Sequence, residues 1–152
     1  MNLSLETIVT WLCLHAPHFG GWPDGRLGEW LTWWARHSSL YVVLESEGEE
    51  ILAVGVAYPC DWEDLGRQWN VPKPDGHCLY VECLVALAGG VPFFFPLLDR
   101  QVTDWREKYL IGRRGTRLKW IEPEHLQRWI NRNLCKSTHQ LHGQWRPKDA
   151  RH

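Results

Sequence analysis

A histidine and a glutamate are the two residues whose types and settings best suit proton transfer. His18 lies in the turn-rich stretch 18–23, directly after an amphipathic segment. Glu82 lies in the apolar run 77–87, where a carboxylate is costly unless it is paired or hydrogen-bonded. Buried carboxylates of this kind are candidates for function. We therefore take His18 and Glu82 as a candidate catalytic pair. The alternatives are a surface histidine and a structural ion pair between Glu82 and an arginine of 113–117.

A second set of residues has the chemistry to bind an anionic group. Gly89 and Gly90 precede a predicted helix, whose first backbone N–H groups can hold an anion. Arg113 and Arg114 belong to a basic cluster over residues 100–119, which could bind CoA phosphates or an acidic carrier protein. We take these four residues as candidate donor-binding residues, the alternative for the cluster being a solvated surface.

Charge is distributed unevenly along the chain, although the net charge is only −1. Residues 1–99 carry 4 Lys and Arg against 13 Asp and Glu, whereas residues 100–152 carry 13 against 5. Such asymmetry indicates either a basic surface for an anionic partner or two parts that pair with each other. Nucleic acid is an unlikely partner, because no recognised binding motif is present and the pI of about 6.7 is low for that role.

Length and composition favour one domain in the cytoplasm. A chain of 152 residues fits one domain, and its eleven tryptophans either fill the core or line a groove. No apolar run reaches the roughly 18 residues of a membrane span, and the N-terminus lacks the positive start of a secretory signal. The five cysteines form no regular framework, so we expect reduced thiols.

Hydrophobic periodicity predicts four helices and four strands. The helices are expected at 5–16, 26–37, 94–109 and 123–134, and the strands at 40–45, 51–58, 77–87 and 113–121. A hairpin turn at 46–49 argues against a purely parallel sheet. We therefore expect an α/β (α+β) fold with a mixed, mostly antiparallel sheet flanked by helices. The domain is expected to span residues 1–134, followed by a polar tail over 135–152.

Strict alternation along the strand 77–87 makes a further prediction about its faces. It places Glu82 beside Tyr80 and Leu84 on one face, and it places Cys78 and Cys83 on opposite faces. A zinc site needs three or four converging ligands, so no metal site is expected.

The order of elements resembles the GNAT-like acyltransferase fold, in which two helices precede an antiparallel meander and a helix follows the central strand. Ala88-Gly89-Gly90-Val91-Pro92-Phe93 corresponds to the donor-binding loop of that family. Local similarity is to the toxin-activating lysine acyltransferases, and it is carried by segments such as Trp22-Pro23, Tyr41-Val42-Val43-Leu44 and Tyr80-Val81-Glu82. Those enzymes carry a histidine before a Trp-Pro pair and an aspartate on the central strand. His18 and Glu82 fall near these two positions.

The resemblance implies transfer of an acyl group from an acyl carrier protein or acyl-CoA to a lysine or a small amine. His18 or Glu82 would take a proton from the amine, or the carboxylate would orient the imidazole. The main alternative is a catalytically inert relative that holds another protein, for example as an accessory factor of a virus or mobile element.

Overall fold

The first helical layer is built by the N-terminal residues. The computed structural model describes residues 3–45, 50–87, 91–133 and 141–142. Helix α1 (Leu5–His15) begins at Ser4, whose hydroxyl accepts a hydrogen bond from the Thr7 amide at 3.1 Å. The 3₁₀ turn η1 (Pro17–Gly21) follows, because Pro17 disfavours helical geometry at the residue before it. Helix α2 (Arg26–Arg36) then completes the layer.

A sheet forms the centre of the molecule, with six strands among the described residues. Its strands are β1 (Leu40–Glu45), β2 (Ile51–Cys60), β3 (Cys78–Ala86), β4 (Tyr109–Arg114), β5 (Arg117–Ile121) and β6 (Leu141–His142). Their order across the sheet is β5-β4-β3-β2-β1-β6, and only the pair β3–β4 is parallel. The prediction of a mixed, mostly antiparallel sheet flanked by helices is thus confirmed. Strand β6 lies within the predicted tail 135–152, so two residues of that segment return to the sheet beside β1.

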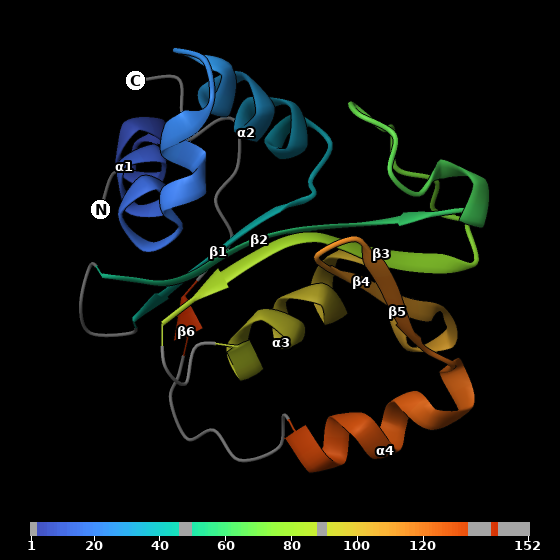
Figure 1. The fold of residues 1–152 in the computed structure, drawn as a ribbon. Helices are drawn as coiled ribbons and strands as arrows, with labels where there is room; N and C mark the ends of the chain where they lie inside the picture. The colour runs from blue at the N-terminus through green and yellow to red at the C-terminus, as the bar shows by residue number, and fades with distance from the viewer. Residues whose placement is uncertain (1–2, 46–49, 88–90, 134–140, 143–152) are drawn as a thin grey trace.

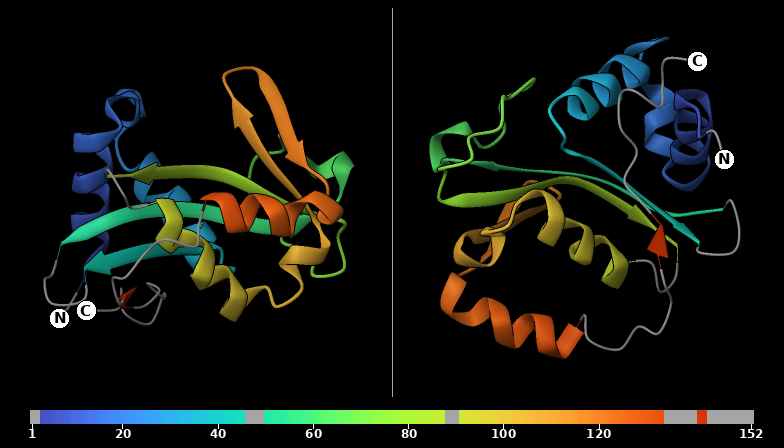
Figure 2. Two further views of the ribbon diagram at one scale, coloured as in Figure 1. Left: turned by 90° about the horizontal axis from the view of Figure 1, so that it is seen from below. Right: turned by 180° about the vertical axis from the view of Figure 1, so that it is seen from behind.

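The two faces of the sheet are covered by different helices (Figures 1 and 2). On one face, Ile8 and Leu12 of α1 and Leu31 of α2 pack against the sheet in one core. On the other face, α3 (Val91–Gln101) and α4 (Pro123–Asn133) build a second core around Phe94 and Leu126. None of the described helices is long and apolar enough to cross a membrane.

The helix in the crossover from β3 to β4 ends earlier than the sequence predicts. The helix expected at 94–109 ends at Gln101, a 3₁₀ turn η3 covers Trp105–Glu107, and Tyr109 already belongs to β4. The indole of Trp105 donates a hydrogen bond to Asp99 at 2.7 Å and its ring lies in the core, so the chain must turn there. The long segment 61–77 holds a single 3₁₀ turn, η2 (Trp62–Asp64).

The strand expected at 113–121 is a hairpin instead. Strands β4 and β5 pair antiparallel, with Arg114 opposite Arg117 and Gly115-Thr116 between them. Gly115 has φ +60, a left-handed conformation that glycine adopts at little cost and that two-residue hairpin loops need. The hairpin stands away from the rest of the sheet (Figure 2).

Strands β3 and β4 separate part of the way along. Their parallel pairing runs from Cys78–Tyr109 to Val81–Gly112 and then ends, although both strands continue. At the same place β3 contains a bulge, because Val56 pairs with Cys83 while Ala57 pairs with Val81. Glu82 is therefore the extra residue, and it lies where the sheet opens.

Candidate functional site

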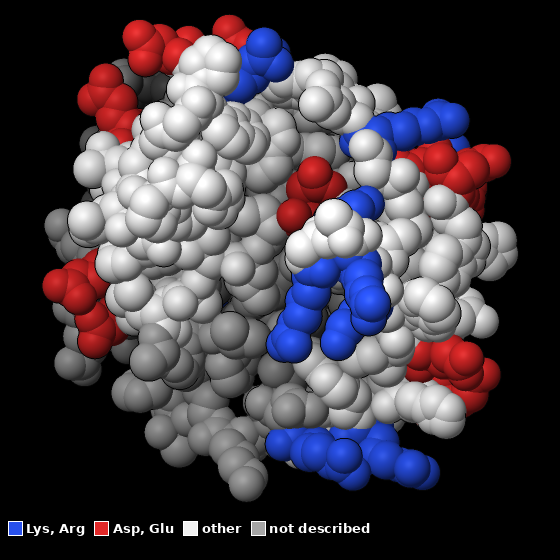
Figure 3. All heavy atoms as spheres, viewed as in Figure 1, with Lys and Arg blue, Asp and Glu red and all other residues white. Residues whose placement is uncertain are grey.

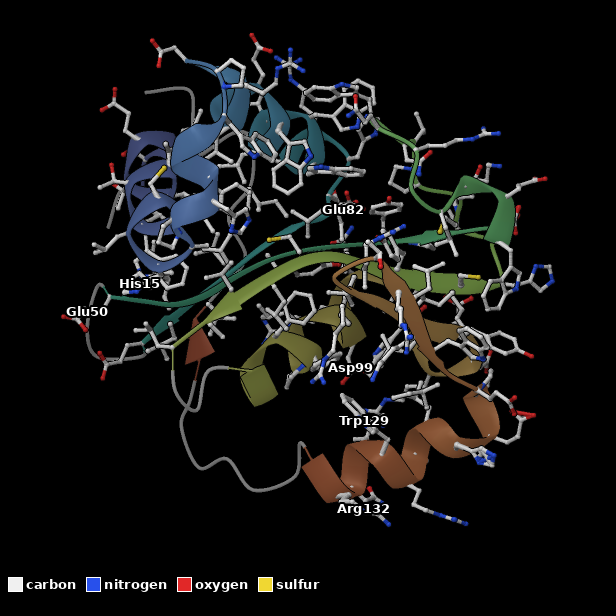
Figure 4. All side chains as sticks on the ribbon, in the orientation of Figure 1. His15, Glu50, Glu82, Asp99, Trp129 and Arg132 are labelled. Carbon is white, nitrogen blue, oxygen red and sulfur yellow. The ribbon has the colours of Figure 1, made fainter. Side chains whose placement is uncertain are left out.

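A cleft of about 680 Å³ lies between the α1–α2 layer and the open part of the sheet. Its walls come from η1 and α2, from the loop that holds Gln68 and Trp69, and from residues 82–85 of β3. His18 and Glu82 both line it. Figure 3 shows an acidic group at the bottom of a hollow between the helical layer and the β4–β5 hairpin, and Figure 4 labels Glu82 at this place. The fold therefore brings the two candidate catalytic residues to one cleft.

Aromatic rings form one wall of the cleft. Phe19 contacts Trp22 edge to face, with ring centroids 5.2 Å apart, and Trp22 contacts Trp30 in the same way at 5.4 Å. Trp30 in turn meets Trp34 at 6.4 Å. Edge-to-face packing restrains the rings, so this wall is apolar and preorganised. The tryptophans thus both line a groove and fill the core: Trp22 and Trp30 line the cleft, whereas Trp105 is buried in the second core.

Glu82 is half-buried and accepts one hydrogen bond from the protein. The Tyr58 hydroxyl donates to its Oε2 at 3.4 Å. Burial raises the pKa of the Glu82 carboxyl, whereas this hydrogen bond and the nearby positive charge of Arg113 lower it. The structural ion pair considered from the sequence does not form, because in the described part of the chain no Arg or Lys nitrogen lies within 4 Å of the carboxylate.

Tyr58 connects Glu82 to the long loop between β2 and β3. The Asn70 amide donates to the Tyr58 hydroxyl at 3.3 Å and to the Asp64 carbonyl at 2.7 Å. Asn70 and Tyr58 are both buried, and the Tyr58 ring stacks on Trp34 with centroids 4.5 Å apart and planes 12° apart. Because each group is held from two sides, the hydroxyl that faces Glu82 has a fixed position.

The loop itself is anchored by buried charge. Asp64 is 3% exposed, and its carboxylate meets the Lys73 ammonium at 2.9 Å and the Asp61 amide at 3.0 Å. A paired and hydrogen-bonded buried carboxylate fixes the chain around it. The segment that carries Gln68 and Trp69 to the cleft is therefore held in place.

His18 lies on η1 at the rim of the cleft and is exposed. Its ring contacts Phe19, with ring centroids 4.3 Å apart. Among the described residues, no hydrogen bond or ion pair holds the imidazole, and none joins it to Glu82. His18 and Glu82 thus line one cleft, and in the described structure no hydrogen bond or ion pair joins them.

The four predicted donor-binding residues do not lie together in the described structure. Arg113 lies beside the cleft, where its Nε donates to the Tyr80 hydroxyl at 3.4 Å. Arg114, the next residue of the same strand, points to the opposite face of the hairpin. Gly89 and Gly90 lie outside the described residues.

The bulge at Glu82 corrects the predicted faces of β3. Tyr80, Cys83 and Val85 pack in the core under α1 and α2, whereas Leu84 packs in the core on the other side of the sheet. The extra residue reverses the alternation, so Cys78 and Cys83 share one face instead of lying on opposite faces. Even so, residues 3–45, 50–87, 91–133 and 141–142 contain no group of three or more His, Cys, Asp or Glu that could hold a metal ion.

Two residues of the site, Tyr58 and Asn70, were not found by sequence reasoning. The tyrosine could have been suspected, since the predicted antiparallel meander brings the end of 51–58 opposite the start of 77–87. The asparagine offered no signal, because its position depends on how the loop folds.

Fold and cleft together define a mixed α/β domain whose parallel strand pair opens into a pocket with a carboxylate at its base. Comparison of the chain with protein-family models, curated proteins and solved structures finds no match.

Proposed function

We propose that this protein transfers an acyl group from a thioester, carried by an acyl carrier protein or by CoA, to a lysine or small amine. One observation carries the proposal: His18 and Glu82, distant in sequence, line the same cleft at the point where β3 and β4 separate. The resemblance of the element order to GNAT-like acyltransferases supports the same reaction class.

The reaction requires a base and a place for the acyl group. The amine nitrogen attacks the thioester carbonyl, the C–S bond breaks, the amine gives up a proton and the leaving thiolate takes one up. An unpaired imidazole at the rim of the cleft can accept the proton from the amine. The Glu82 carboxyl, whose pKa is raised by burial, is able to exchange a proton or to attract the incoming ammonium.

The aromatic wall supplies the place for the acyl group. Trp22 and Trp30 present apolar surface in the same cleft as Val85. Burying apolar surface yields roughly 25 cal/mol per Å², so an alkyl chain laid along this wall is held and oriented. Binding energy from such a non-reacting part of the substrate positions the thioester at the reacting groups.

The test is acyl transfer measured with purified protein, acyl carrier protein or CoA thioesters, and lysine-containing acceptors. His18→Ala and Glu82→Gln should each lower kcat/KM by about 100-fold or more, the usual contribution of a general acid or base. His15→Ala and Glu124→Gln are matched controls, because both residues are exposed and lie outside the cleft.

Full activity in both cleft variants would remove the proposed roles. If the wild-type protein transfers from no thioester and binds none in calorimetry, the chain is an inert relative, of the accessory kind considered from the sequence.

A further inference from the structure

The β4–β5 hairpin carries three cations on one face. Arg114 pairs with Arg117 across the hairpin, and Lys119 pairs with Gly112. The intervening Leu118 packs in the core under α1 and α2, so Arg117 and Lys119 point to the opposite side of the strand. Arg114 lies on that side too, because its neighbour Arg113 turns toward Tyr80 and the cleft.

These three side chains differ from two neighbouring cations that form ion pairs. Arg106 pairs with Asp99 at 3.2 Å, and Lys108 pairs with Asp104 at 3.4 Å. Arg114, Arg117 and Lys119 are exposed, and in the described structure no ion pair or hydrogen bond engages them. Residues 109–121 contain no Asp or Glu. The three cations therefore place uncompensated positive charge on one face of the hairpin, where Figure 3 shows basic side chains gathered.

The arrangement is unfavourable for the isolated chain. Like charges directly opposite in an antiparallel pair destabilise it, and Arg114 and Arg117 are such a pair. The surface beside Lys119 is also open, since a side chain at Gly112 would meet no atom within 4 Å. An anionic partner seated on this face would remove the repulsion and would meet no steric obstacle at Gly112.

The chemistry of the face favours an acidic protein over a nucleic acid. Trp120, the exposed aromatic residue of the hairpin, lies on the other face, where it pairs with Ile111 in register and contacts Trp62 edge to face. The basic face thus lacks a ring on which bases would stack.

We propose that Arg114, Arg117 and Lys119 form the docking face for the acidic carrier protein that delivers the acyl thioester. This inference rests on the proposed function. The same hairpin borders the cleft through Arg113, whose charge acts on the Glu82 carboxyl, so a carrier on its outer face has only the hairpin between itself and the cleft. Because the three cations point away from the cleft, they suit a protein that spans the hairpin, whereas a small donor within the cleft would not reach them.

Binding is tested with the full chain and with acyl carrier protein by calorimetry at 50 and 300 mM salt. The triple variant R114E/R117E/K119E should bind at least tenfold more weakly at low salt and should lose most of the salt dependence. Arg128→Glu, a charge reversal on the exposed face of α4, is the matched control and should bind as the wild type does. If the triple variant does not fold, R114A/R117A/K119A replaces it, with a smaller loss in the same direction.

Transfer assays separate this proposal from the proposed function. From acyl carrier protein, the triple variant should show a KM raised at least tenfold with kcat within about twofold. Transfer from an uncharged N-acetylcysteamine thioester should be unchanged. If the wild type and the triple variant bind acyl carrier protein equally, the docking face is refuted. It is also refuted if the wild type binds a 20-nucleotide RNA and does not bind the carrier. If the wild type binds the carrier, the triple variant does not, and no donor supports transfer by the wild type, the docking face is supported and the catalytic proposal is refuted.

Discussion

The hydroxyl of Tyr58 should control the ionisation of Glu82, and Tyr58→Phe removes that hydroxyl alone. The phenyl ring still stacks on Trp34, and Asn70 keeps its hydrogen bond to the Asp64 carbonyl. The main loss is the donor that faces Glu82 Oε2 at 3.4 Å. The variant therefore separates the electrostatics of the site from its packing.

The size of the effect follows from that geometry. A well-formed hydrogen bond to a charged group contributes about 1.5–3 kcal/mol, and a distance at the outer limit of hydrogen bonding reduces this to about 1 kcal/mol. Since 1.4 kcal/mol corresponds to a factor of ten in an equilibrium constant, Glu82 should become a weaker acid by about fivefold. The direction is fixed: losing a donor to the carboxylate raises the pKa of Glu82 further above its ordinary value.

Carbon-13 NMR of the glutamate side-chain carboxyls, followed across a pH titration, measures this pKa without any substrate. Tyr41→Phe is the control, because its hydroxyl lies in the core on the other face of the sheet and has no hydrogen-bond partner in the described structure. An unchanged Glu82 titration in Tyr58→Phe would refute the reasoning, since it would mean that solvent and not Tyr58 sets the charge of the carboxylate.

Two further predictions concern stability. Burial raises the pKa of Glu82, so the folded state binds the proton more tightly than the unfolded state does. The free energy of unfolding of the wild type should therefore fall as the pH rises from the ordinary carboxyl pKa through the raised pKa. Glu82→Gln should therefore be more stable than the wild type above that pH window, and this gain in stability should disappear below it. Urea denaturation at pH 4 and pH 8 measures the difference in unfolding free energy between the two proteins. The same difference at both pH values would contradict the prediction. Gly55→Ala should destabilise the protein by about 1–3 kcal/mol, because the new methyl group would overlap the buried Phe94 ring. Thermal unfolding measures that loss, and an unchanged Tm would show that the ring moves freely.

Local patterns in the sequence were sufficient for most of the secondary structure. Apolar residues at helical spacing placed α1, α2 and α4 within about a residue or two at each end, and apolar runs with turn residues between them placed β1, β2 and β3. These elements have periodic patterns that each segment carries by itself. The hairpin at Gly115-Thr116 was missed because the basic residues on both sides of it obscure the break in the apolar pattern.

Two candidate residues, His18 and Glu82, were also identifiable from the sequence, one by its turn and one by its apolar surroundings. The sequence did not show that the two residues line one cleft, because this depends on where the pairing of β3 with β4 ends and on how η1 packs over the sheet. The bulge at Glu82, which reverses the faces of the residues that follow it, depends on register with β2, which is a property of two strands together. The sequence by itself determined the elements and the polar residue placed within an apolar strand. Only the tertiary structure decided which residues after Glu82 share its face and which hydroxyl it meets, because register, splay and loop position arise from contacts between segments far apart in the chain.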